Sequence, residues 1–534
     1  MSDYNISEVI DKHFPFEKYN PGQKKAIVFA VANLLKGKKH ILMELPTGLG
    51  KSAIATTIHR VMREISFPQK AWRTSILTAT KGLQDQYVKD DPEIYSLKGK
   101  ANYRCPFPGV ISYGTPGCMK LTHSGGCVPH AKCPYVKTRV HFMEKAELRL
   151  TNTSFQINAP LALIGAEKSR VDLTVIDECH EIDDRLIDAA SLIIKKEDLE
   201  KFHVPCNGID GKILDFINTF QEFGKGQNFH LNSDIREDCE TVLSSLTDEI
   251  LRLKELGKTD ASSAILAEDL KSIQDGIYDF LTGNGEWILE DWTMGSLLHL
   301  VPVYAYQVVD RALYHKCDQF IHMSATICGF DGYMRTMGID PKDAAILDAP
   351  NPIPVESRRV QPLNALKISG FYSPVELAKF VDMIIDKHGM ENGIIHTVSF
   401  KLAKEILENS KHNSRMLISN DRKEILSYLG GKGRILLSPS VETGYDFKGD
   451  LARWQILAKV PYGYLGSNYI KLNTERDGKW YARKAVVRLV QAAGRAVRGV
   501  DDYAVTYVID SNFARLYNDN MELFPSWFKD SVTK

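Results

Sequence analysis

The sequence predicts an α/β protein built from two parallel-sheet domains, the first of which is interrupted by two insertions. Two stretches of the chain alternate short β-rich runs with amphipathic segments, a pattern typical of parallel α/β domains. The 534 residues also exceed the roughly 250–300 residues at which a single hydrophobic core stops growing. A cysteine-rich segment and a long helical segment separate the runs of the first stretch. We therefore expect several domains.

Each stretch contains five runs that we expect to form buried strands. In the first stretch they are HILMEL (40–45), TSILTAT (74–80), LRLTN (148–152), LTVIDEC (173–179) and QFIHMSAT (319–326). In the second they are GIIHTVSF (393–400), RMLISN (415–420), RILLSPS (434–440), WQILAKV (454–460) and AVTYVID (504–510). The link over residues 334–357 is rich in Pro and Asp, which suits a domain boundary.

Apolar residues recur at helical spacing in the second interruption, which indicates ordinary helix core rather than a cofactor site. They are Leu243, Leu246, Ile250 and Leu253, then Leu266, Leu270, Ile273, Ile277 and Phe280. We predict the first domain in three parts, at residues 1–103, 141–183 and 292–335. A cysteine segment at 104–140 and a helical insertion at 184–291 would interrupt it, and the second domain would span 336–534.

Composition favours a protein that works in the cytoplasm. The start, MSDYNISEVIDKHF, lacks the basic residues and apolar run of a signal peptide. No run reaches the ~18 apolar residues of a membrane span, so we expect no membrane contact. In a reducing compartment, clustered cysteines more often bind metal than form disulfides. The 67 Lys and Arg residues balance the 67 Asp and Glu residues, so bulk charge indicates no partner.

The distribution of charge does indicate a partner. The segment from Ile94 to Met143 contains no Asp or Glu, whereas seven Lys or Arg residues alternate with six Tyr or Phe residues. Cations that meet phosphates and flat rings that meet bases are what a single-strand nucleic-acid surface needs. The alternative interpretation is a loop solvated by its lysines.

The motif MELPTGLGKSAI (43–54) predicts a phosphate-binding loop between a strand and a helix. Its glycines allow a tight turn whose N–H groups surround phosphate oxygens, Lys51 would reach the β- and γ-phosphates, and Ser52 would bind Mg²⁺. The predicted loop consists of Pro46, Thr47, Gly48, Leu49, Gly50, Lys51 and Ser52. Leu45 stands where the strict pattern has Gly, so the match is to the looser P-T-G-x-G-K-S form. A chance Gly-rich turn is the alternative.

An acidic pair, Asp177 and Glu178, ends the strand LTVIDECH. Beside a phosphate-binding loop, the first carboxylate fits Mg²⁺ coordination, and the second can act as general base on the attacking water. A surface acidic turn is the alternative, and the loop upstream makes the catalytic interpretation stronger.

The second domain ends with a basic motif, VRLVQAAGRAVRG. Gln491, Arg495 and Arg498 are separated by four and three residues, which predicts that they share one helix face. Arginines that face a nucleotide on another domain can stabilise charge on the transferring phosphoryl group. A solvated basic helix is the alternative.

Two further motifs follow buried strands. SPSVETGYDF contains Glu442, Gly444 and Asp446, and it predicts a second loop at the seam between the domains. HMSATI, with Ser324, Ala325 and Thr326, ends the last strand of the first domain, where small hydroxyl groups could relay the state of the phosphates.

Four cysteines in the first interruption predict a metal site. Cys105, Cys118, Cys127 and Cys133 are spaced C-x12-C, C-x8-C and C-x5-C, without the C-x2-C pair of zinc ribbons. Four thiolates are the usual ligands of a [4Fe–4S] cluster. Zn²⁺, with His130 as an alternative ligand, remains open, and inert buried thiols are a third interpretation. Because the segment has few long apolar runs, a metal would have to hold it together.

Taken in order, these motifs resemble the superfamily 2 helicases and, within them, the iron–sulfur XPD/DinG family. The resemblance covers nearly the whole chain through NPGQ, PTGLGKS, TATKGLQDQ, the four cysteines, DECH, SAT, TGYDF and QAAGRAVR. LKGKANYRC before the first thiol and CPY after the last favour the DinG side. Cys179 stands where many relatives carry Ala. Because Gln23 comes so early, we expect no fused exonuclease domain.

The resemblance implies two RecA-like motor domains, with an iron–sulfur domain and a helical arch inserted in the first. It implies a monomeric ATP-dependent DNA helicase that moves 5′ to 3′ on single-stranded DNA and opens forked or 5′-tailed duplexes. The implied cofactors are ATP, Mg²⁺ and a [4Fe–4S] cluster, with Zn²⁺ as the alternative to the cluster. Gln23 would recognise adenine, and Thr80, Lys81 and Gln84 would line the DNA path. We hypothesise that the cluster is a structural staple rather than an electron carrier.

Three other functions stay open at this point. An RNA or RNA–DNA hybrid helicase, or a translocase that does not unwind, would share the same motifs. A non-enzymatic nucleic-acid-binding protein with a degenerate motor is disfavoured by the intact Lys51, Asp177, Glu178 and Arg498.

Overall fold

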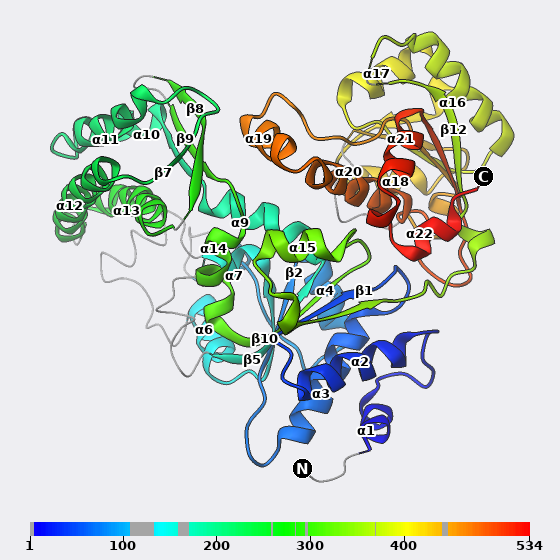
Figure 1. Ribbon diagram of the computed structural model, residues 1–534, viewed down its shortest axis with the longest axis horizontal. Coiled ribbons are helices and arrows are strands. Elements are labelled where there is room, and N and C mark those ends of the chain that lie inside the picture. The colour runs from blue at the N-terminus through cyan, green and yellow to red at the C-terminus, as the bar shows by residue number, and fades with distance from the viewer. Residues whose placement is uncertain are drawn as a thin grey trace.

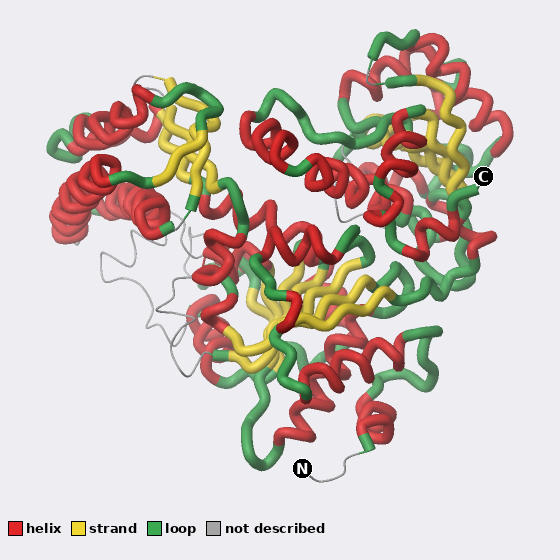
Figure 2. Tube along the Cα trace, viewed as in Figure 1, coloured by secondary structure: helices red, strands yellow, loops and turns green. Residues whose placement is uncertain are grey.

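Two lobes, each built on a parallel sheet, and a third unit inserted in the first lobe make up the computed structural model (Figures 1 and 2). It describes residues 5–106, 133–158, 170–257, 260–283, 285–293, 297–368, 370–439 and 447–533. In Figure 1 the first lobe lies at the bottom, the second lobe at the upper right and the inserted domain at the upper left.

The first lobe contains a sheet whose strand pairs are all parallel within the described residues. In spatial order its strands are β11 (Ala344–Asp348), β1 (His40–Glu44), β10 (Cys317–Ser324), β5 (Val171–Asp177), β2 (Thr74–Thr78), β4 (Leu148–Asn152) and β3 (Tyr95–Leu97). All five strands that the sequence predicts here are confirmed. β3 and β11 are short edge strands without a strong apolar run, and the sequence did not predict them.

Both faces of this sheet are covered by helices, which explains why β1, β2 and β5 are buried along their whole length. Ile41 and Met43 of β1 pack on one face and Leu42 on the other, because successive side chains of a strand point to opposite sides. On the first face lie α1 (Ile6–His13), α2 (Gln23–Leu35) and α3 (Lys51–Ser66). On the second face lie α9 (Ile182–Ala190), α14 (Tyr306–Ala312) and α15 (Phe330–Met337).

Strand order brings three motifs together at one edge of the first sheet. β1, β10 and β5 are neighbours, and the register sets Glu44 beside Ser324 and Met323 beside Asp177. The phosphate-binding loop, the SAT motif and the acidic pair therefore all emerge at the carboxyl ends of adjacent strands. In open α/β sheets this edge is where ligands bind.

The second lobe has its own parallel sheet, and the five strands predicted for it are confirmed. In spatial order the described strands are β12 (Val360–Leu366), β17 (Val505–Asp510), β16 (Trp454–Leu457), β13 (Gly393–His396), β15 (Ile435–Ser438) and β14 (Met416–Ile418). α16 (Pro374–His388) and α17 (Phe400–Asn409) cover one face. α18 (Arg422–Leu429), α20 (Gly478–Ala493), α21 (Asn512–Asp519) and α22 (Ser526–Ser531) pack against the other.

The inserted domain contains more strand than the sequence predicts. The predicted apolar stripes form its core, on α12 (Ser233–Leu256) and α13 (Ala261–Thr282), with α10 (Lys196–Phe202) and α11 (Ile209–Asn218) beside them. An antiparallel sheet of β6 (Leu192–Lys195), β9 (Leu297–Pro302), β8 (Glu286–Thr293) and β7 (Asn228–His230) joins these helices. The sequence missed this sheet because its helical stripes dominate the apolar pattern.

Helix packing and strand pairing shift two of the predicted domain limits. α9 packs on the first sheet and β9 pairs with β8, which favours 192–302 for the inserted domain over the predicted 184–291. β11 belongs to the first sheet and β12 to the second, so the chain changes sheet between Asp348 and Val360, beyond the predicted limit at residue 335. Within the part of the chain described here, no helix has the length and apolar character needed to cross a membrane.

Candidate active site

The loop between β1 and α3 has the backbone of a phosphate-binding loop. Gly48 and Gly50 have φ angles of 87° and 80°, in the left-handed region that other residues rarely adopt. At Gly50 a Cβ atom would also lie 2.5 Å from the side-chain nitrogen of Gln23, so a larger residue would displace that side chain. Lys51 opens α3, whose N-terminus supplies unpaired N–H groups and a positive dipole end to an anion.

Gln23 fastens this loop. Its side chain is buried, its Oε1 accepts a hydrogen bond from the backbone N–H of Asn20 at 3.0 Å, and its Nε2 donates to the carbonyl of Gly50 at 3.3 Å. Asn20 Nδ2 in turn donates to the carbonyl of Gly48 at 2.9 Å. The residue expected from the resemblance to recognise adenine is thus in contact with the loop that would hold the phosphates.

The acidic pair faces the loop. Glu178 Oε1 lies 3.4 Å from Lys51 Nζ, and Asp177 Oδ2 accepts a hydrogen bond from the hydroxyl of Tyr87 at 3.0 Å. Glu178 has a φ of 56°, which is unusual for a residue with a side chain. Such local strain often accompanies function, because the surrounding structure must stabilise it. Here it turns the Glu178 carboxylate away from the direction of the strand and toward Lys51.

Burial and neighbouring charges shift the pKa values of the pair in opposite directions. Burial and the adjacent Glu178 charge raise the pKa of Asp177 to about 6. Burial would also raise the pKa of Glu178, but the cations Lys51, His180 and Arg498 outweigh it and lower that pKa to about 2. Burial works to lower the pKa of Lys51, but Glu178 and Asp177 keep it above the usual value. Lys51 and Glu178 are therefore both charged.

A chain of hydrogen bonds connects Glu178 to the second lobe. Ser324 Oγ donates to Glu178 Oε2 at 3.4 Å and lies 3.3 Å from Thr326 Oγ1. Gln491 Nε2, from α20 of the second lobe, donates to Thr326 Oγ1 at 2.5 Å. The two hydroxyls of the SAT motif thus stand between the acidic pair of one lobe and the glutamine of the other, as the relay interpretation requires. Ala325 lies buried between them.

The interpretation of Gln491, Arg495 and Arg498 as one helix face is wrong. α20 ends at Ala493, with Gly494 as its C-cap; Arg495 follows in a turn, and Arg498 lies in irregular chain after it. Glycine is a poor helix former because its backbone loses the most freedom. The spacing rule could not detect this end because it assumes that the helix continues.

Leaving the helix brings the arginine segment onto the phosphate-binding loop. A Cβ atom at Gly48 would lie 3.4 Å from the carbonyl oxygen of Arg498, so the two backbones nearly touch. The charge of Arg498 also acts on Glu178 and Lys51, as their pKa values record. Arg495 is buried inside the second lobe, where its charge contributes to lowering the pKa of His396 after burial has done so.

Several residues predicted to bind Mg²⁺ or DNA make other contacts in the structure. Ser52 Oγ donates to Asp90 Oδ2 at 3.5 Å. Thr80 caps α4 (Lys81–Asp90) by accepting from the N–H of Leu83, and Lys81 is exposed. Gln84 is fully buried and donates to the carbonyl of Leu97, so the expectation that it lines a DNA path is wrong. Its polar side chain serves the backbone of β3 instead.

Some predicted positions lie outside the described residues. They are Cys118, Cys127, His130, Glu442, Gly444 and Asp446. The two outer cysteines, Cys105 and Cys133, are described and half-buried, with free thiols. Among described residues no group of three or more His, Cys, Asp or Glu side chains is arranged to hold a metal ion.

Sequence reasoning missed a buried ion-pair cluster across the seam. Asp183 of α9 lies 3.2 Å from Arg483 Nη2 and 2.8 Å from Lys484 Nζ of α20, and Lys484 also contacts Asp184 at 2.7 Å. Burial would raise the pKa of Asp183, but the two cations lower it to about 2. Removing one partner of such a buried pair costs about 3–5 kcal/mol. The acidic run after DECH and the basic start of α20 were the only available signals.

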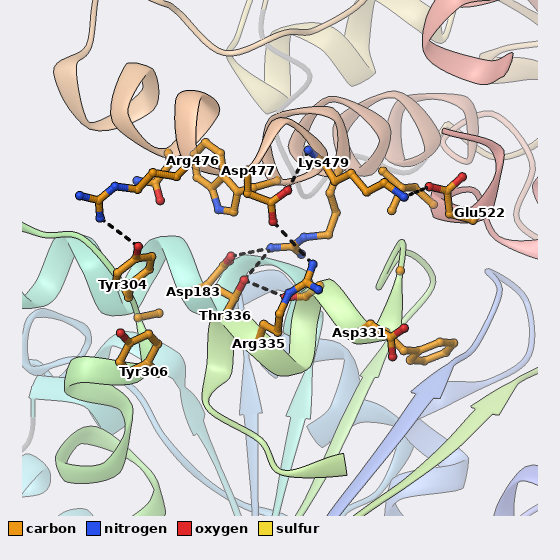
Figure 3. A pocket seen from close by; sticks show the side chains of 18 of the residues that line it. Asp183, Tyr304, Tyr306, Asp331, Arg335, Thr336, Arg476, Asp477, Lys479 and Glu522 are labelled. Atoms are coloured by element: carbon orange, nitrogen blue, oxygen red, sulfur yellow. Dashed lines mark hydrogen bonds and ion pairs between the residues drawn. The ribbon is translucent and has the colours of Figure 1, made fainter. Parts of the chain in front are cut away.

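The same cluster borders a cavity of about 720 Å³ in the seam (Figure 3). Figure 3 shows Arg476, Asp477 and Lys479 on the second-lobe side, and Tyr304 and Arg335 opposite them. The cavity reaches Glu44, at the base of the phosphate-binding loop, but residues 46–52 do not line its described walls. It is therefore a neighbour of the nucleotide site and not the site itself.

Two protein families match parts of the chain. The family described as helicase C-terminal domain matches residues 381–531, and the family described as type III restriction enzyme, res subunit, matches residues 17–203. A probable ATP-dependent helicase of Methanocaldococcus jannaschii is 21% identical over 95% of this chain and 93% of its own length. The XPD/RAD3 helicase subunit of transcription and DNA repair factor IIH from Saccharomyces cerevisiae is 28% identical over 19% of this chain and 14% of its own.

Solved structures match the fold. A structure titled XPD helicase has a TM-score of 0.62 at 14% identity and covers 97% of this chain and 100% of its own. A structure of S. tokodaii Xpd4 has a TM-score of 0.59 at 16% identity, over 96% and 100% of the two chains. These likenesses confirm the expected α/β fold of two RecA-like lobes.

The position of Arg498 generates a prediction. Replacing it with alanine should lower the turnover number for ATP hydrolysis by ~10³–10⁵, because a positively charged finger stabilises the transferring phosphoryl group. Steady-state ATPase measurements with single-stranded DNA test this. Arg515, exposed on α21, gives the matched control, and Arg515→Ala should behave as wild type. An Arg498→Ala protein with near-normal turnover would exclude Arg498 as the finger.

Proposed function

We propose that this chain is a superfamily 2 helicase of the XPD/DinG type that hydrolyses ATP and uses that hydrolysis to move along single-stranded DNA. We propose movement from 5′ to 3′ and separation of forked or 5′-tailed duplexes by a monomer. The hydrogen-bond chain from Gln491 to Glu178 is the observation that carries the proposal. It makes a carboxylate of one lobe depend on the position of the other, which is what coupling of hydrolysis to movement requires.

In the proposed site, ATP lies at the seam on the phosphate-binding loop. The N–H groups of the loop and the N-terminus of α3 surround the phosphates, and Lys51 pairs with the β- and γ-phosphates. Gln23 holds the loop in shape through its hydrogen bond to the carbonyl of Gly50. By the resemblance of NPGQ, it would also recognise adenine. Gly444 and Asp446 complete the second-lobe side in the proposal, by the resemblance of TGYDF.

Binding of ATP changes the state of Glu178. In the structure Lys51 pairs with Glu178, and this cation is the largest influence that lowers the pKa of Glu178 against burial. Lys51 cannot serve the carboxylate and the phosphates fully at the same time. When it turns to the phosphates, Glu178 loses that stabilisation, its affinity for a proton rises, and it becomes a better general base for the attacking water.

The remaining polar groups would stabilise the negative charge of the phosphates. Ser52 and Asp177 would hold Mg²⁺, which when bound neutralises charge on the β- and γ-phosphate oxygens. Arg498 would approach the γ-phosphate from the second lobe, where its backbone already meets Gly48. Arg495 supports this segment from inside the second lobe.

The proposed DNA path crosses the seam at α4. Thr80 caps this helix, exposed Lys81 follows, and a Cβ atom at Gly82 would lie 3.3 Å from Nη1 of Arg422, at the start of α18 in the second lobe. Lys81 and Arg422 thus place cations from both lobes near one point, which suits a phosphate backbone that both lobes contact. Opening and closing of the seam would then shift the strand.

We also propose that Cys105, Cys118, Cys127 and Cys133 hold a [4Fe–4S] cluster. Cys133 packs against a small apolar cluster that includes Tyr103 and Tyr135, whose ring centroids lie 5.4 Å apart. Cys105 follows Tyr103 by two residues in the chain. Cys133 also sits at the N-cap of α6 (Pro134–Glu144), where the positive end of the helix favours a thiolate. These positions are compatible with four thiolates that converge on one group, for which Zn²⁺ is the alternative.

The proposed direction and substrate predict the outcome of an unwinding assay. Strand separation should occur on 5′-tailed and forked DNA duplexes and should be absent on 3′-tailed and blunt ones, with ATP required. Lys51→Ala should abolish it and serves as the control for contaminating activity. Stronger ATPase stimulation by RNA than by DNA would instead favour an RNA helicase. ATP hydrolysis without any strand separation would favour a translocase.

The proposed cluster predicts iron in the purified protein. Anaerobic purification should give a brown protein with about four irons per chain and broad visible absorbance. Cys105→Ser should lose the iron and the unwinding activity but keep ATP binding, because the phosphate-binding loop is separate. Cys206→Ala, at a buried cysteine of the inserted domain, should keep its iron. One zinc per chain and no colour would refute the cluster.

A further inference from the structure

We infer that Glu290 is a positioning residue that couples the inserted domain to the second motor lobe, so that the inserted domain follows that lobe when the seam opens. This inference rests on the proposed function, because it concerns how hydrolysis reaches the part of the molecule outside the two lobes. It assigns a task to a contact between β8 of the inserted domain and α19 (Asn468–Arg476) of the second lobe.

Glu290 binds the first turn of α19. Its two carboxylate oxygens accept hydrogen bonds from the backbone N–H groups of Asn468 at 3.1 Å and Tyr469 at 2.7 Å. Its own carbonyl accepts from Asn468 Nδ2 at 3.0 Å. The first N–H groups of a helix have no partner within the helix and carry its positive dipole end. A carboxylate at this point is therefore held by both charge and hydrogen bonds.

The other end of α19 is held by the same strand. Arg476, in the last turn, contacts Glu286 through both of its terminal nitrogens, one of them at 2.7 Å. It also donates to the hydroxyl of Tyr304 at 2.9 Å, a contact drawn in Figure 3. Glu286 is only 12% exposed in this pair. Strand β8 thus contacts α19 with an acidic side chain at each end.

The local backbone is shaped for this contact. The pairing of β8 with β9 shifts register between Leu289 and Asp291, so Glu290 is the extra residue of a β-bulge. A bulge re-aims a side chain that would otherwise alternate across the sheet. Gly226, which donates to the carbonyl of Leu289, has a φ of 82°, and a Cβ atom there would lie 2.9 Å from the Asn468 side chain. Glycine at this position therefore leaves room for the Asn468 side chain.

Helix α19 leads directly to the relay. It is followed by α20, which packs beside it and carries Gln491 at its far end, where Gln491 donates to Thr326. A change of state at the phosphates that moves α20 would therefore also move α19. Since β8 of the inserted domain contacts α19 through at least five hydrogen bonds, the movement would pass to it. Without Glu290, the lobes would still close, but the inserted domain would no longer follow.

Distances between fluorophores test this inference without any need for unwinding. One fluorophore goes at exposed Glu237 in the inserted domain, and its partner goes either at Met383 in the second lobe or at Lys24 in the first, introduced as unnatural amino acids. In the wild type, adding a non-hydrolysable ATP analogue should change the distance from the inserted domain to the first lobe and leave the distance to the second lobe constant. In Glu290→Ala the distance to the second lobe should change as well.

ATP hydrolysis and duplex unwinding by the Glu290 variants give a second test of the inference. Glu290→Ala should keep the turnover number and KM of DNA-stimulated ATP hydrolysis within about twofold of wild type, since it touches no part of the site, while unwinding falls at least about tenfold. Glu290→Gln retains one acceptor oxygen, so its unwinding activity should lie between those of wild type and Glu290→Ala. The retained ATPase shows that the variant is folded, and Glu237→Ala is the surface control.

Three results would overturn the inference. They are a wild type whose inserted domain keeps its distance to the first lobe, a Glu290→Ala protein whose distances match wild type, and parallel loss of ATPase and unwinding in that variant. The proposed function fails in a different way, because it is contradicted by a wild-type protein that opens no 5′-tailed duplex, whatever the distances show.

Discussion

The structure depends on one half-buried carboxylate, Glu178, that is held between a cation of its own lobe and a hydrogen-bond chain from the other. Each hydroxyl group has one hydrogen to donate. The series of hydrogen bonds therefore ends on this carboxylate only if every donor points from Gln491 toward Glu178. Gln491 donates to Thr326, Thr326 to Ser324 and Ser324 to Glu178. Donors in such a series polarise one another, which makes the last bond sensitive to the first. A small displacement of α20 therefore changes the environment of the Glu178 carboxylate.

Other contacts across the seam hold the two ends of this chain in place. The ion pairs of Asp183 with Arg483 and Lys484 join α9, which follows the acidic pair, to α20, which carries Gln491. The backbone of Arg498 covers Gly48, and Glu290 ties α19 to the inserted domain. The α19–α20 segment thus contacts all three units of the protein. Its position reports the state of the seam to the inserted domain.

The sequence predicted most of what depends on local pattern. Strands with strong apolar runs, the phosphate-binding loop at Gly48 and Gly50, and the acidic pair after β5 all follow from composition and spacing within short segments. The prediction that one helix carries Arg495 and Arg498 was wrong, because the helix ends before Gly494. Residue spacing alone contains no information about where a helix ends. The expectation that Gln84 lines a DNA path rested on a family motif. Its burial depends instead on β3, a short edge strand that the sequence does not reveal.

Contacts between distant segments could not be predicted, because they depend on tertiary packing. Tyr87 and Asp177, or Glu290 and Asn468, are far apart in the chain, and each contact needs the completed fold. The bulge at Glu290 is a further example, since an acidic residue in a strand usually indicates only an exposed face. The family resemblance supplied roles for individual motifs but gave no account of how α19 connects them.

The most direct test of the account is a double-mutant cycle on the relay, with Thr326→Val and Gln491→Ala measured alone and together. Each single variant should lower the turnover number of DNA-stimulated ATP hydrolysis by at least about tenfold with little change in the KM for ATP, because the relay acts on the carboxylate rather than on binding. The double variant should be no slower than the worse single variant, since both break the same chain. Full multiplication of the two effects, or a Thr326→Val protein with wild-type turnover, would contradict the claim that the lobes communicate through these hydroxyls.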